Sequence, residues 1–311
     1  MSDLGVTVLG LGAIGGFLAA VLWRNGISVT CVAREATAEA IVHSGIRLES
    51  ATFGDFVAYP RVVTRLNHEP DILFVTTKAT TLCDALERVD PYLVANAIVV
   101  PLLNGIEHMQ VLQSRYGKRI VAASVGSVEV IRLSRGHVVH STPSVRIELA
   151  SDGDVQASRL SEFVRLLSSV GIATELLESE AAVLWRKLVR LNAIACATSA
   201  SDRPVGYARS DPWWRKRLEA CVREGAAVAA AEGVRIDPET VMTQIDRLPA
   251  GMLTSMQRDI ASGNASELDA IAGAVVRAAA RYALDCPTIE SLIARIQSRI
   301  ARPDLRQVDT L

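Results

Sequence analysis

The sequence predicts an α/β chain: a mostly parallel sheet with an antiparallel extension, followed by an all-helical domain. Three observations carry this prediction. A glycine-rich turn lies between an apolar strand pattern at Val6–Leu9 and an apolar helical pattern. Further short apolar runs, typical of strands buried on both faces, continue to about residue 176. From Glu180 onward long helical patterns replace the strand signals, so we predict domains at 1–179 and 180–311.

Composition and charge restrict the class of protein. Of the 311 residues, 50% are hydrophobic and 22% charged, and the formal net charge is -1. A chain of this length is expected to form two folded domains and is not mainly disordered. The small net charge and the lack of a basic run argue against a nucleic-acid partner. Neither a membrane-spanning stretch nor a signal peptide is evident, so we expect no membrane partner.

The cysteines and histidines predict a reducing compartment and no metal site. The five cysteines are scattered and lack C-x-x-C spacing: Cys31, Cys83, Cys196, Cys221 and Cys286. Reduced thiols in a cytoplasmic protein explain them best. His137 and His140 are a metal-like pair, but in a strand they point to opposite faces, and no third ligand is evident.

The turn at residues 10–15 predicts a bound dinucleotide. It reads Gly10-Leu11-Gly12-Ala13-Ile14-Gly15, and we assign all six residues to cofactor binding. In a Rossmann-type unit the first glycine makes the tight turn, the second lets the ligand approach the backbone, and the third lets helix pack on strand. The following helix, predicted over Ile14–Trp23, directs free N–H groups at a pyrophosphate. The alternative is a glycine-rich turn without a ligand.

Arg34, two residues after the second predicted strand, distinguishes between two cofactors. That strand is predicted over Ile27–Val32, and an NAD-binding unit has an acidic residue near its end that binds the ribose 2′-OH. Arg34 stands there instead, and its guanidinium can bind a 2′-phosphate, so we expect NADPH rather than NADH. Two alternatives stay open. Arg34 could be a solvated surface residue, and Glu35 could be its partner or a ribose ligand.

Two more predicted strands end at polar residues. The apolar run Asp71–Thr76 leads to Thr77-Lys78, and the run Ala97–Leu103 leads to Asn104-Gly105. Ligands of open α/β sheets gather beyond the carboxyl ends of strands, so Lys78 is a candidate for a cofactor phosphate and Asn104 faces the same crevice. A surface lysine and an ordinary turn are the alternatives. His108 is a weaker candidate for an acid.

The remainder of the first domain reads as short elements. We expect a strand pair within residues 46–63, and the β-type segments between Arg119 and Leu149 predict the antiparallel extension of the sheet. A helix over residues 154–170 and a last strand over 173–176 complete the domain.

A lysine lies on the apolar face of the helix predicted over Ala181–Ala200. At 100° per residue, five apolar residues lie between about −40° and +80° from Lys187: Val183, Leu184, Leu191, Ile194 and Ala195. Charging a lysine against apolar surface is unfavourable, so we expect its pKa to fall toward the range of a general acid. The alternative is a lysine whose amine reaches past the stripe to solvent.

Two polar residues of the later helices complete the candidate set. Ser255 lies in a helix predicted over Ala250–Ala261, and Glu267 stands where the next helical pattern begins. Asn264 with Glu267 three residues later fits a capping box, which would give the carboxylate a structural role. The functional alternative is a carboxylate in the first helical turn that points at a ligand.

These stretches together resemble the ketopantoate reductases (2-dehydropantoate 2-reductases) over nearly the whole chain. The resemblance rests on residues 10–15, Arg34, Thr77-Lys78-Ala79, Asn104-Gly105, 184–188, 255–260 and Glu267-Leu268-Asp269. It implies NADPH-dependent reduction of a 2-keto acid, most simply ketopantoate to pantoate in pantothenate biosynthesis. It implies a helical domain of the 6-phosphogluconate dehydrogenase-like class, and Arg34 and Lys78 as ligands of the 2′-phosphate.

The resemblance also implies roles around the substrate. Asn104 lies between cofactor and substrate, and Lys187 protonates the carbonyl oxygen as the hydride reaches carbon 2. Glu267 holds a substrate hydroxyl, and Ser255 helps to bind the carboxylate end. A partly desolvated lysine suits this chemistry because the alkoxide that forms needs a proton and a nearby positive charge.

The sequence departs from the family pattern in the lysine helix. The family usually has asparagines four and eight residues after the lysine, and those positions are Leu191 and Ala195 here. Asn192 lies five residues on, about 140° round an ideal helix from Lys187. We predict a π-bulge that turns Asn192 back toward the substrate and puts Cys196 in place of the second asparagine. Because a hydrogen-bonding group is missing in either case, the substrate can differ from ketopantoate.

Two other functions stay open from the sequence. One is a reductase for a different, branched or bulkier 2-keto acid, which Cys196 and Trp213-Trp214 favour. The other is a non-catalytic NADPH-binding sensor, which would keep Arg34 but would not need Lys187 or Glu267. The oligomeric state is undetermined, and a homodimer formed through the alanine-rich helical domain is one option.

Overall fold

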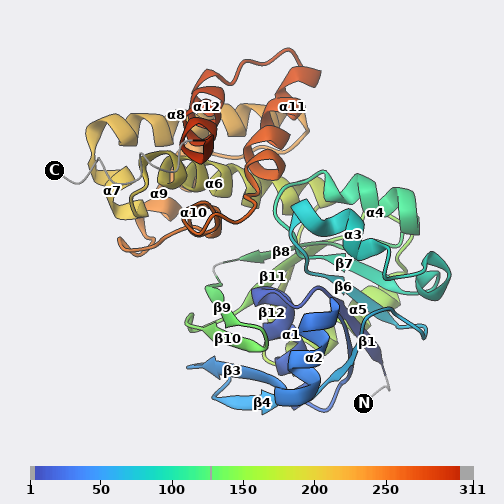
Figure 1. The fold of residues 1–311 in the computed structure, drawn as a ribbon. Coiled ribbons are helices and arrows are strands. Elements are labelled where there is room, and N and C mark those ends of the chain that lie inside the picture. The colour runs from blue at the N-terminus through green and yellow to red at the C-terminus, as the bar shows by residue number, and fades with distance from the viewer. Residues whose placement is uncertain (1–3, 127, 302–311) are drawn as a thin grey trace. The chain divides into compact units, whose positions relative to one another are not determined.

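The computed structural model describes residues 4–126 and 128–301 (Figure 1). The chain divides into two compact units. Unit 1 is Met1–Leu103 with His108–Val183, and unit 2 is Asn104–Glu107 with Leu184–Leu311. The short segment Asn104–Glu107 therefore packs with the C-terminal helices, although residues of unit 1 precede and follow it in the chain.

A five-stranded parallel sheet forms the centre of unit 1 (Figure 1). Its strands, in spatial order, are β5 (Arg61–Val63), β2 (Ser28–Val32), β1 (Gly5–Leu9), β6 (Ile72–Val75) and β7 (Ile98–Pro101). Leu9, the last residue of β1, pairs with the last residues of both neighbours, Val32 and Val75. The carboxyl ends of these strands are thus level, and whatever follows each strand emerges at one edge. This is the predicted Rossmann-type arrangement.

Buried apolar side chains explain why these segments form the sheet. The residues of β6 and β7 are all buried, as expected for parallel strands covered on both faces. Helix α1 (Ala13–Arg24) buries Phe17, Leu18 and Leu22 against the sheets. The other helices of unit 1 are α2 (Glu35–Ser44), η1 (Ala79–Thr81), α3 (Leu82–Leu86), η2 (Pro91–Val94), α4 (His108–Tyr116) and α5 (Ala157–Ser169).

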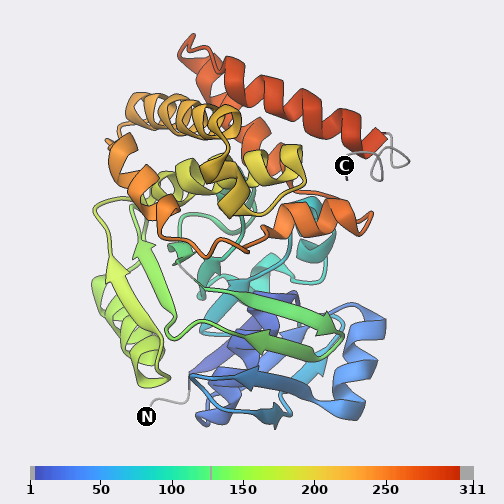
Figure 2. The ribbon, with the colours of Figure 1, turned by 90° about the vertical axis from the view of Figure 1, so that its left-hand side faces the viewer.

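The predicted antiparallel extension is divided between two further sheets. One has the order β12 (Ala173–Leu176), β11 (Arg146–Ala150), β8 (Ala122–Gly126), and it adjoins the main sheet through a bridge between Val99 and Ile120. The other has the order β4 (Phe56–Ala58), β3 (Ile46–Ser50), β10 (His137–His140), β9 (Val130–Ser134), as Figure 2 shows. The short segments form strands as expected. The pairing of β10 with β3, however, joins residues about 90 positions apart, and the periodicity of the sequence does not predict it.

The four-stranded sheet covers the helix that follows the glycine turn. A Cβ on Gly16 of α1 would lie 2.9 Å from a methyl carbon of Val138 in β10, so strand and helix are in close contact. His140, at the end of β10, packs against Phe17 of α1 with ring centroids 4.9 Å apart. Its Nδ1 lies 2.8 Å from Ser50 Oγ and its Nε2 lies 2.8 Å from Thr142 Oγ1. His140 therefore has a polar contact at each ring nitrogen inside an apolar cluster.

Burial of His140 is expected to make unit 1 sensitive to acid. Desolvation lowers the pKa of His140 below its ordinary value, which is about 6.5. The folded state therefore binds a proton less readily than the unfolded chain, so stability is full above about pH 6.5 and falls as the pH decreases through that value. We expect the His140→Gln variant to show a smaller drop in the free energy of unfolding between pH 7 and pH 5 than the unmodified protein. Urea denaturation at each pH measures this difference.

The matched control is His43→Gln, because His43 is exposed on α2 of the same unit. Its pH dependence should follow that of the unmodified protein. An equal loss of pH dependence in both variants would contradict the assignment to His140.

Unit 2 is helical over its described residues. Helix α6 (Glu180–Ser201) enters it at Leu184, and the helices that follow are α7 (Val205–Ser210), α8 (Pro212–Ala231), α9 (Pro238–Asp246), α10 (Ser255–Ala261), the π-helix η3 (Asp269–Gly273), α11 (Ala274–Arg281) and α12 (Pro287–Ala301). Side-chain caps explain several starts: Asp211, Asp237 and Thr254 each accept backbone N–H bonds at the N-termini of α8, α9 and α10. Among the described residues, none of the helices has the length and apolar character that crossing a membrane requires.

Candidate functional site

The three glycines of the turn after β1 have different steric surroundings. Gly10 has φ +95°, which favours glycine, and a Cβ there would lie 2.7 Å from Thr77 Cγ2. A Cβ on Gly15 would lie 2.0 Å from the carbonyl oxygen of Gly10 and 2.4 Å from Thr76 Oγ1. A Cβ on Gly12 would meet its nearest neighbour, Thr76 O, at 3.9 Å. The fold itself thus requires glycine at positions 10 and 15, whereas at position 12 it leaves room for a ligand.

Hydrogen bonds hold the turn at the carboxyl edge of the sheet. The Thr76 hydroxyl donates to the carbonyl oxygens of Leu9 at 3.1 Å and Gly10 at 2.6 Å. The Gly10 N–H donates to Val32 O at 3.0 Å. Helix α1 then begins with Gly12 as its N-cap and has no acidic residue in its first turn. Its positive end is not neutralised by a carboxylate of that turn, which suits a phosphate.

Arg34 and Lys78 leave the sheet from the strands on either side of β1. Arg34 follows β2 and is the exposed N-cap residue of α2. Lys78 follows β6 and is the exposed residue before η1. Because β2 and β6 both pair with β1 in parallel, the two cations emerge at the same edge as the glycine turn. Their positions suit the predicted roles toward a phosphate.

Glu35 has a partner other than Arg34. Arg88 donates to Glu35 Oε1 at 3.1 Å and to Oε2 at 3.4 Å, and it also donates to Thr64 O at 3.0 Å. These bonds from Arg88 lower the pKa of the Glu35 carboxyl. The structure therefore pairs Glu35 with Arg88 rather than with Arg34.

Helix α6 presents Lys187 on a partly exposed, otherwise apolar face. Lys187 is half-buried, as are Leu184 one turn before it and Leu191 one turn after it. The predicted π-bulge is wrong: every residue from Glu180 to Ser201 is α-helical. With regular geometry the positions at one and two turns beyond Lys187 are Leu191 and Ala195, so both positions at which the family usually has asparagines are apolar here.

Without the bulge, Asn192 points into the interior of unit 2. It is fully buried, and its Oδ1 accepts a bond from the Cys196 thiol at 3.3 Å. Its Nδ2 has no hydrogen-bond partner among the described residues. Burial raises the pKa of Cys196 to about 12. A regular helix holds Asn192 about 140° round from Lys187, so the substrate role predicted for Asn192 and Cys196 loses the geometric basis on which it was proposed.

The Lys187 face of α6 leads to the start of α10. Thr198 lies eleven residues after Lys187, within about 20° of it round the helix. Its hydroxyl is 3.0 Å from the hydroxyl of Thr254, and both side chains are buried. Thr254 in turn caps α10 by accepting the Gln257 N–H at 3.3 Å. Through these contacts α6 holds the N-terminus of α10, where the predicted substrate ligand Ser255 is exposed as the first helical residue.

Glu267 and Asn104 lie together in unit 2 although 163 positions separate them. The Asn104 amide donates to Glu267 Oε2 at 3.0 Å, and Glu267 is only 5% exposed. The capping box with Asn264 does not form, because residues 264–267 are not helical and helical geometry begins at Leu268. Instead the Leu268 N–H is accepted by Ser266 Oγ at 3.3 Å. The Glu267 carboxylate is thus available to the Asn104 amide instead of capping a helix.

Two features, one in each unit, were not predicted from the sequence. One is the Thr76 hydroxyl, whose signal was a polar residue at the end of a buried strand. The other is the π-helix η3, which directly follows the segment of Glu267, whereas we expected such an irregularity beside Lys187. A π turn often occurs at a functional site. Its position depends here on tertiary contacts rather than on a recognisable motif.

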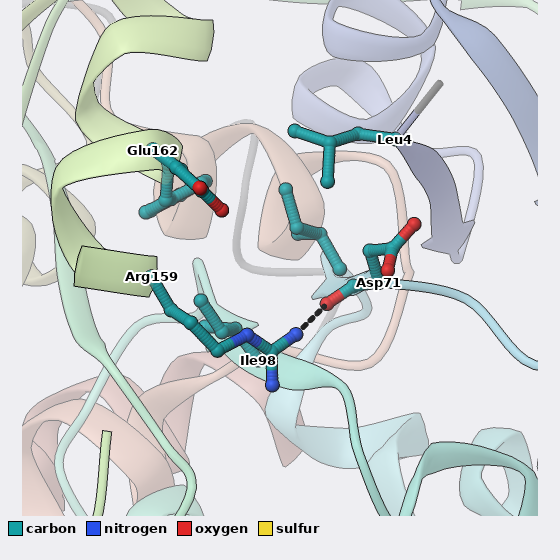
Figure 3. A pocket seen from close by; sticks show the side chains of 7 residues that line it. Leu4, Asp71, Ile98, Arg159 and Glu162 are labelled. Atoms are coloured by element: carbon teal, nitrogen blue, oxygen red, sulfur yellow. Dashed lines mark hydrogen bonds between the residues drawn. The ribbon is translucent and has the colours of Figure 1, made fainter. Parts of the chain in front are cut away.

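A small pocket lies at the opposite edge of the main sheet (Figure 3). Its lining residues include Asp71 and Ile98, which stand at the amino ends of β6 and β7, and Arg159 of α5. Arg159 donates to Asp71 O at 3.4 Å. The pocket has room for about one water molecule. Since ligands of such sheets bind at the carboxyl ends of the strands, we assign it no substrate or cofactor.

Comparison with protein families gives two matches that together cover most of the chain. A family model described as ketopantoate reductase PanE/ApbA matches residues 6–152. A second model, described as ketopantoate reductase PanE/ApbA C terminal, matches residues 181–299.

Individual proteins agree with these matches. The chain is 26% identical to a 2-dehydropantoate 2-reductase of Archaeoglobus fulgidus over 93% of this chain and 95% of that protein. A PanE/ApbA family ketopantoate reductase from Ralstonia eutropha JMP134 superposes with a TM-score of 0.86 at 25% identity, covering 97% of this chain and 100% of the other. A ternary structure of D-mandelate dehydrogenase with NADH and anilino(oxo)acetate has a TM-score of 0.88 at 21% identity with the same coverage, and it shares the fold.

Proposed function

The chain belongs to the ketopantoate reductase family, and from that premise we propose that it reduces ketopantoate to pantoate. Membership makes the protein an NADP-dependent oxidoreductase that acts on 2-keto acids. The observation that carries the proposal is in unit 2: a buried carboxylate, Glu267, is bound by the Asn104 amide. The same unit has a half-buried lysine, Lys187, on an apolar helix face.

The cofactor is assigned to the glycine turn of unit 1. The open space at Gly12 lets a pyrophosphate approach the N-terminus of α1, and Arg34 and Lys78 bind the 2′-phosphate. When bound, NADPH supplies the hydride that reduces the keto carbon. The residues fit this cofactor because the turn offers backbone N–H groups and two cations at one edge of the sheet, and Glu35 is bound to Arg88.

The substrate is assigned to three groups of unit 2. Lys187 donates the proton to the carbonyl oxygen, where negative charge develops as carbon 2 is reduced. Glu267 accepts a hydrogen bond from a substrate hydroxyl, and Asn104 holds the carboxylate in place through its bond to Oε2. Ser255, exposed at the start of α10, binds the substrate carboxylate with its hydroxyl.

A different 2-keto acid is the second candidate, and the observation that favours it is the helix face beside Lys187. Leu191, half-buried one turn beyond Lys187, cannot donate or accept a hydrogen bond through its side chain, so a substrate next to it is better matched by an apolar side chain than by a hydroxylated one. Trp213 and Trp214, which raised the same alternative, contact each other on α8, and Arg217 and Arg295 lie over the Trp213 ring. These contacts give both tryptophans a structural role, so they do not by themselves favour a bulkier substrate.

A panel of 2-keto acids tests the proposal. NADPH absorbance is followed with ketopantoate, with the branched apolar 2-keto acid that lacks its hydroxyl, and with an aromatic 2-keto acid. The proposal expects the highest kcat/KM for ketopantoate. A higher value for an apolar keto acid would assign the second candidate, and no turnover of any of them would favour the NADPH-binding sensor.

Cofactor preference tests the role of Arg34. A charged hydrogen-bonded contact contributes about 1.5–3 kcal/mol, so the Arg34→Ala variant is expected to bind NADPH about 10- to 100-fold more weakly. Binding of NADH, which lacks the 2′-phosphate, should change little. Fluorescence titration with both cofactors measures the two Kd values. Arg165→Ala is the control, because Arg165 is an exposed arginine on α5 of the same unit. Equal weakening for NADPH and NADH would contradict the contact.

A further inference from the structure

Three charged side chains of unit 2 form a cluster next to the Asn104–Glu267 pair. Arg277 of α11 binds both carboxylate oxygens of Glu107, from Nε and from Nη2, each at 2.8 Å. From Nη1 it also binds Asp269 Oδ1 at 2.7 Å. A fourth bond runs from its Nη2 to the backbone oxygen of Asp269 at 3.1 Å. One guanidinium thus joins the segment Asn104–Glu107 to the first turn of η3.

Two glycines make this arrangement sterically feasible. Gly105 has φ +84°, and a Cβ there would lie 2.3 Å from the carbonyl oxygen of Ala270 in η3. A Cβ on Gly273 would lie 2.7 Å from Asp269 Oδ1 and 3.0 Å from Arg277 Nη1. The absence of side chains at both positions lets the backbone of residues 104–107 touch η3 and lets the Asp269–Arg277 pair form.

The π-helix explains why Arg277 can reach Asp269. The N–H of Ala274 bonds to Asp269 O, five residues earlier, which is the wider π pattern. A regular α-helix would place Arg277 about 80° round the axis from Asp269. The wider turn closes much of that angle and brings both side chains to the face that contacts Glu107. The π-helix η3 therefore allows the Asp269–Arg277 contact to form.

The segment Asn104–Glu107 needs such an anchor. It is four residues long and packs with unit 2, whereas the residues before and after it in the chain belong to unit 1. The Asn104–Glu267 bond contributes less than the conformational entropy that is lost when all four residues of the segment are ordered. An isolated exposed ion pair adds little to the stability of such a loop. A guanidinium that binds two carboxylates, one of them with two parallel hydrogen bonds, adds more.

We propose that Glu107, Asp269 and Arg277 are positioning residues, which keep the Asn104 amide on Glu267 and so keep the carboxylate oriented for substrate. The assignment of Glu267 to substrate rests on the proposed function. The cluster acts through the loop: Arg277 holds Glu107, Gly105 lies on Ala270, and Asn104 then meets Oε2 of Glu267. Loss of the guanidinium fork should free the loop and weaken substrate binding, while Lys187 and cofactor binding stay unchanged.

The test compares Arg277→Gln with Arg215→Gln. Arg215 is a matched control, because it also bridges two carboxylates of unit 2, Glu219 and Asp246. For Arg277→Gln we expect KM for the best 2-keto acid to rise about tenfold at nearly constant kcat, and Kd for NADPH to stay unchanged. Arg277→Lys, which has the charge without the fork, should recover only part of the loss. Arg215→Gln should leave KM unchanged.

Hydrogen exchange separates this proposal from the proposed function. Backbone amides of residues 102–109 should exchange faster in Arg277→Gln than in Arg215→Gln or the unmodified protein. Equal exchange in this segment, or an unchanged KM, would overturn the positioning role. If the unmodified protein reduced no 2-keto acid, the proposed function would fail, and the exchange of residues 102–109 would still decide whether the cluster anchors the loop.

Discussion

Replacing Lys187 with alanine is expected to lower kcat for 2-keto acid reduction by about 100- to 10,000-fold, the usual contribution of a positioned general acid. The reason is the half-buried place of Lys187 on the apolar face of α6, where its ammonium can donate a proton to a developing alkoxide. Kd for NADPH should stay unchanged, because the cofactor is assigned to unit 1. Steady-state rates and a fluorescence titration measure the two effects separately.

Two further variants make this prediction specific. Lys187→Arg keeps a positive charge but cannot release a proton near neutral pH, so it should recover substrate binding and little of kcat. Lys216→Ala removes an exposed lysine of α8 in the same unit and should leave kcat unchanged. If Lys187→Ala turned over keto acid as fast as the unmodified protein, the acid would have to be another group.

The second large effect is expected at the glycine turn, where alanine substitutions at Gly15 and Gly12 should differ in their effect on stability. Gly15→Ala places a Cβ 2.0 Å from Gly10 O and 2.4 Å from Thr76 Oγ1, so α1 must shift away from the sheet. Overpacking of this kind lowers the free energy of unfolding by about 1–3 kcal/mol or more. Because the same shift displaces the turn, NADPH binding should be lost as well. Urea denaturation and NADPH titration measure the two losses.

Gly12→Ala is the matched comparison. Its Cβ has 3.9 Å of space, so the free energy of unfolding should fall by no more than about 1 kcal/mol, the usual effect at an N-cap. Kd for NADPH should nevertheless rise about tenfold or more, because the methyl group occupies the space through which a pyrophosphate approaches the backbone. Unchanged NADPH binding in Gly12→Ala would argue against a dinucleotide at this turn.

Local patterns predicted much of unit 1 correctly. The strand that ends at Leu9 follows from a mostly apolar run, and the turn after it follows from its three glycines. The roles predicted for the glycines agree with their surroundings, since Gly10 has a positive φ and Gly15 contacts the strand end. Such features depend on a few neighbouring residues, and those neighbours are readable in the sequence.

The differences from the predictions lie in two segments of unit 2. The π-bulge was placed beside Lys187, because the spacing of Asn192 suggested it, but α6 is regular and the interior of unit 2 accommodates the buried amide through Cys196. The π turn lies in η3 instead. The capping box, which was the structural alternative for Glu267, does not form, because residues 264–267 are not helical; the carboxylate binds Asn104 instead. For Glu267 the partner is 163 positions away, whereas Asn192 bonds to Cys196 only four residues on in the same regular helix.

The sequence by itself determined the Rossmann-type sheet, the helical second part, the edge at which a phosphate can bind, and the presence of a lysine on an apolar helix face. Each follows from periodicity or from a residue type that a backbone conformation requires. Only the tertiary structure decided three contacts. Asn104 donates a hydrogen bond to Glu267, Arg88 pairs with Glu35, and Arg277 binds Glu107 in the segment Asn104–Glu107. The reason is physical: these contacts join residues 53 to 170 positions apart, and packing of whole elements brings them together.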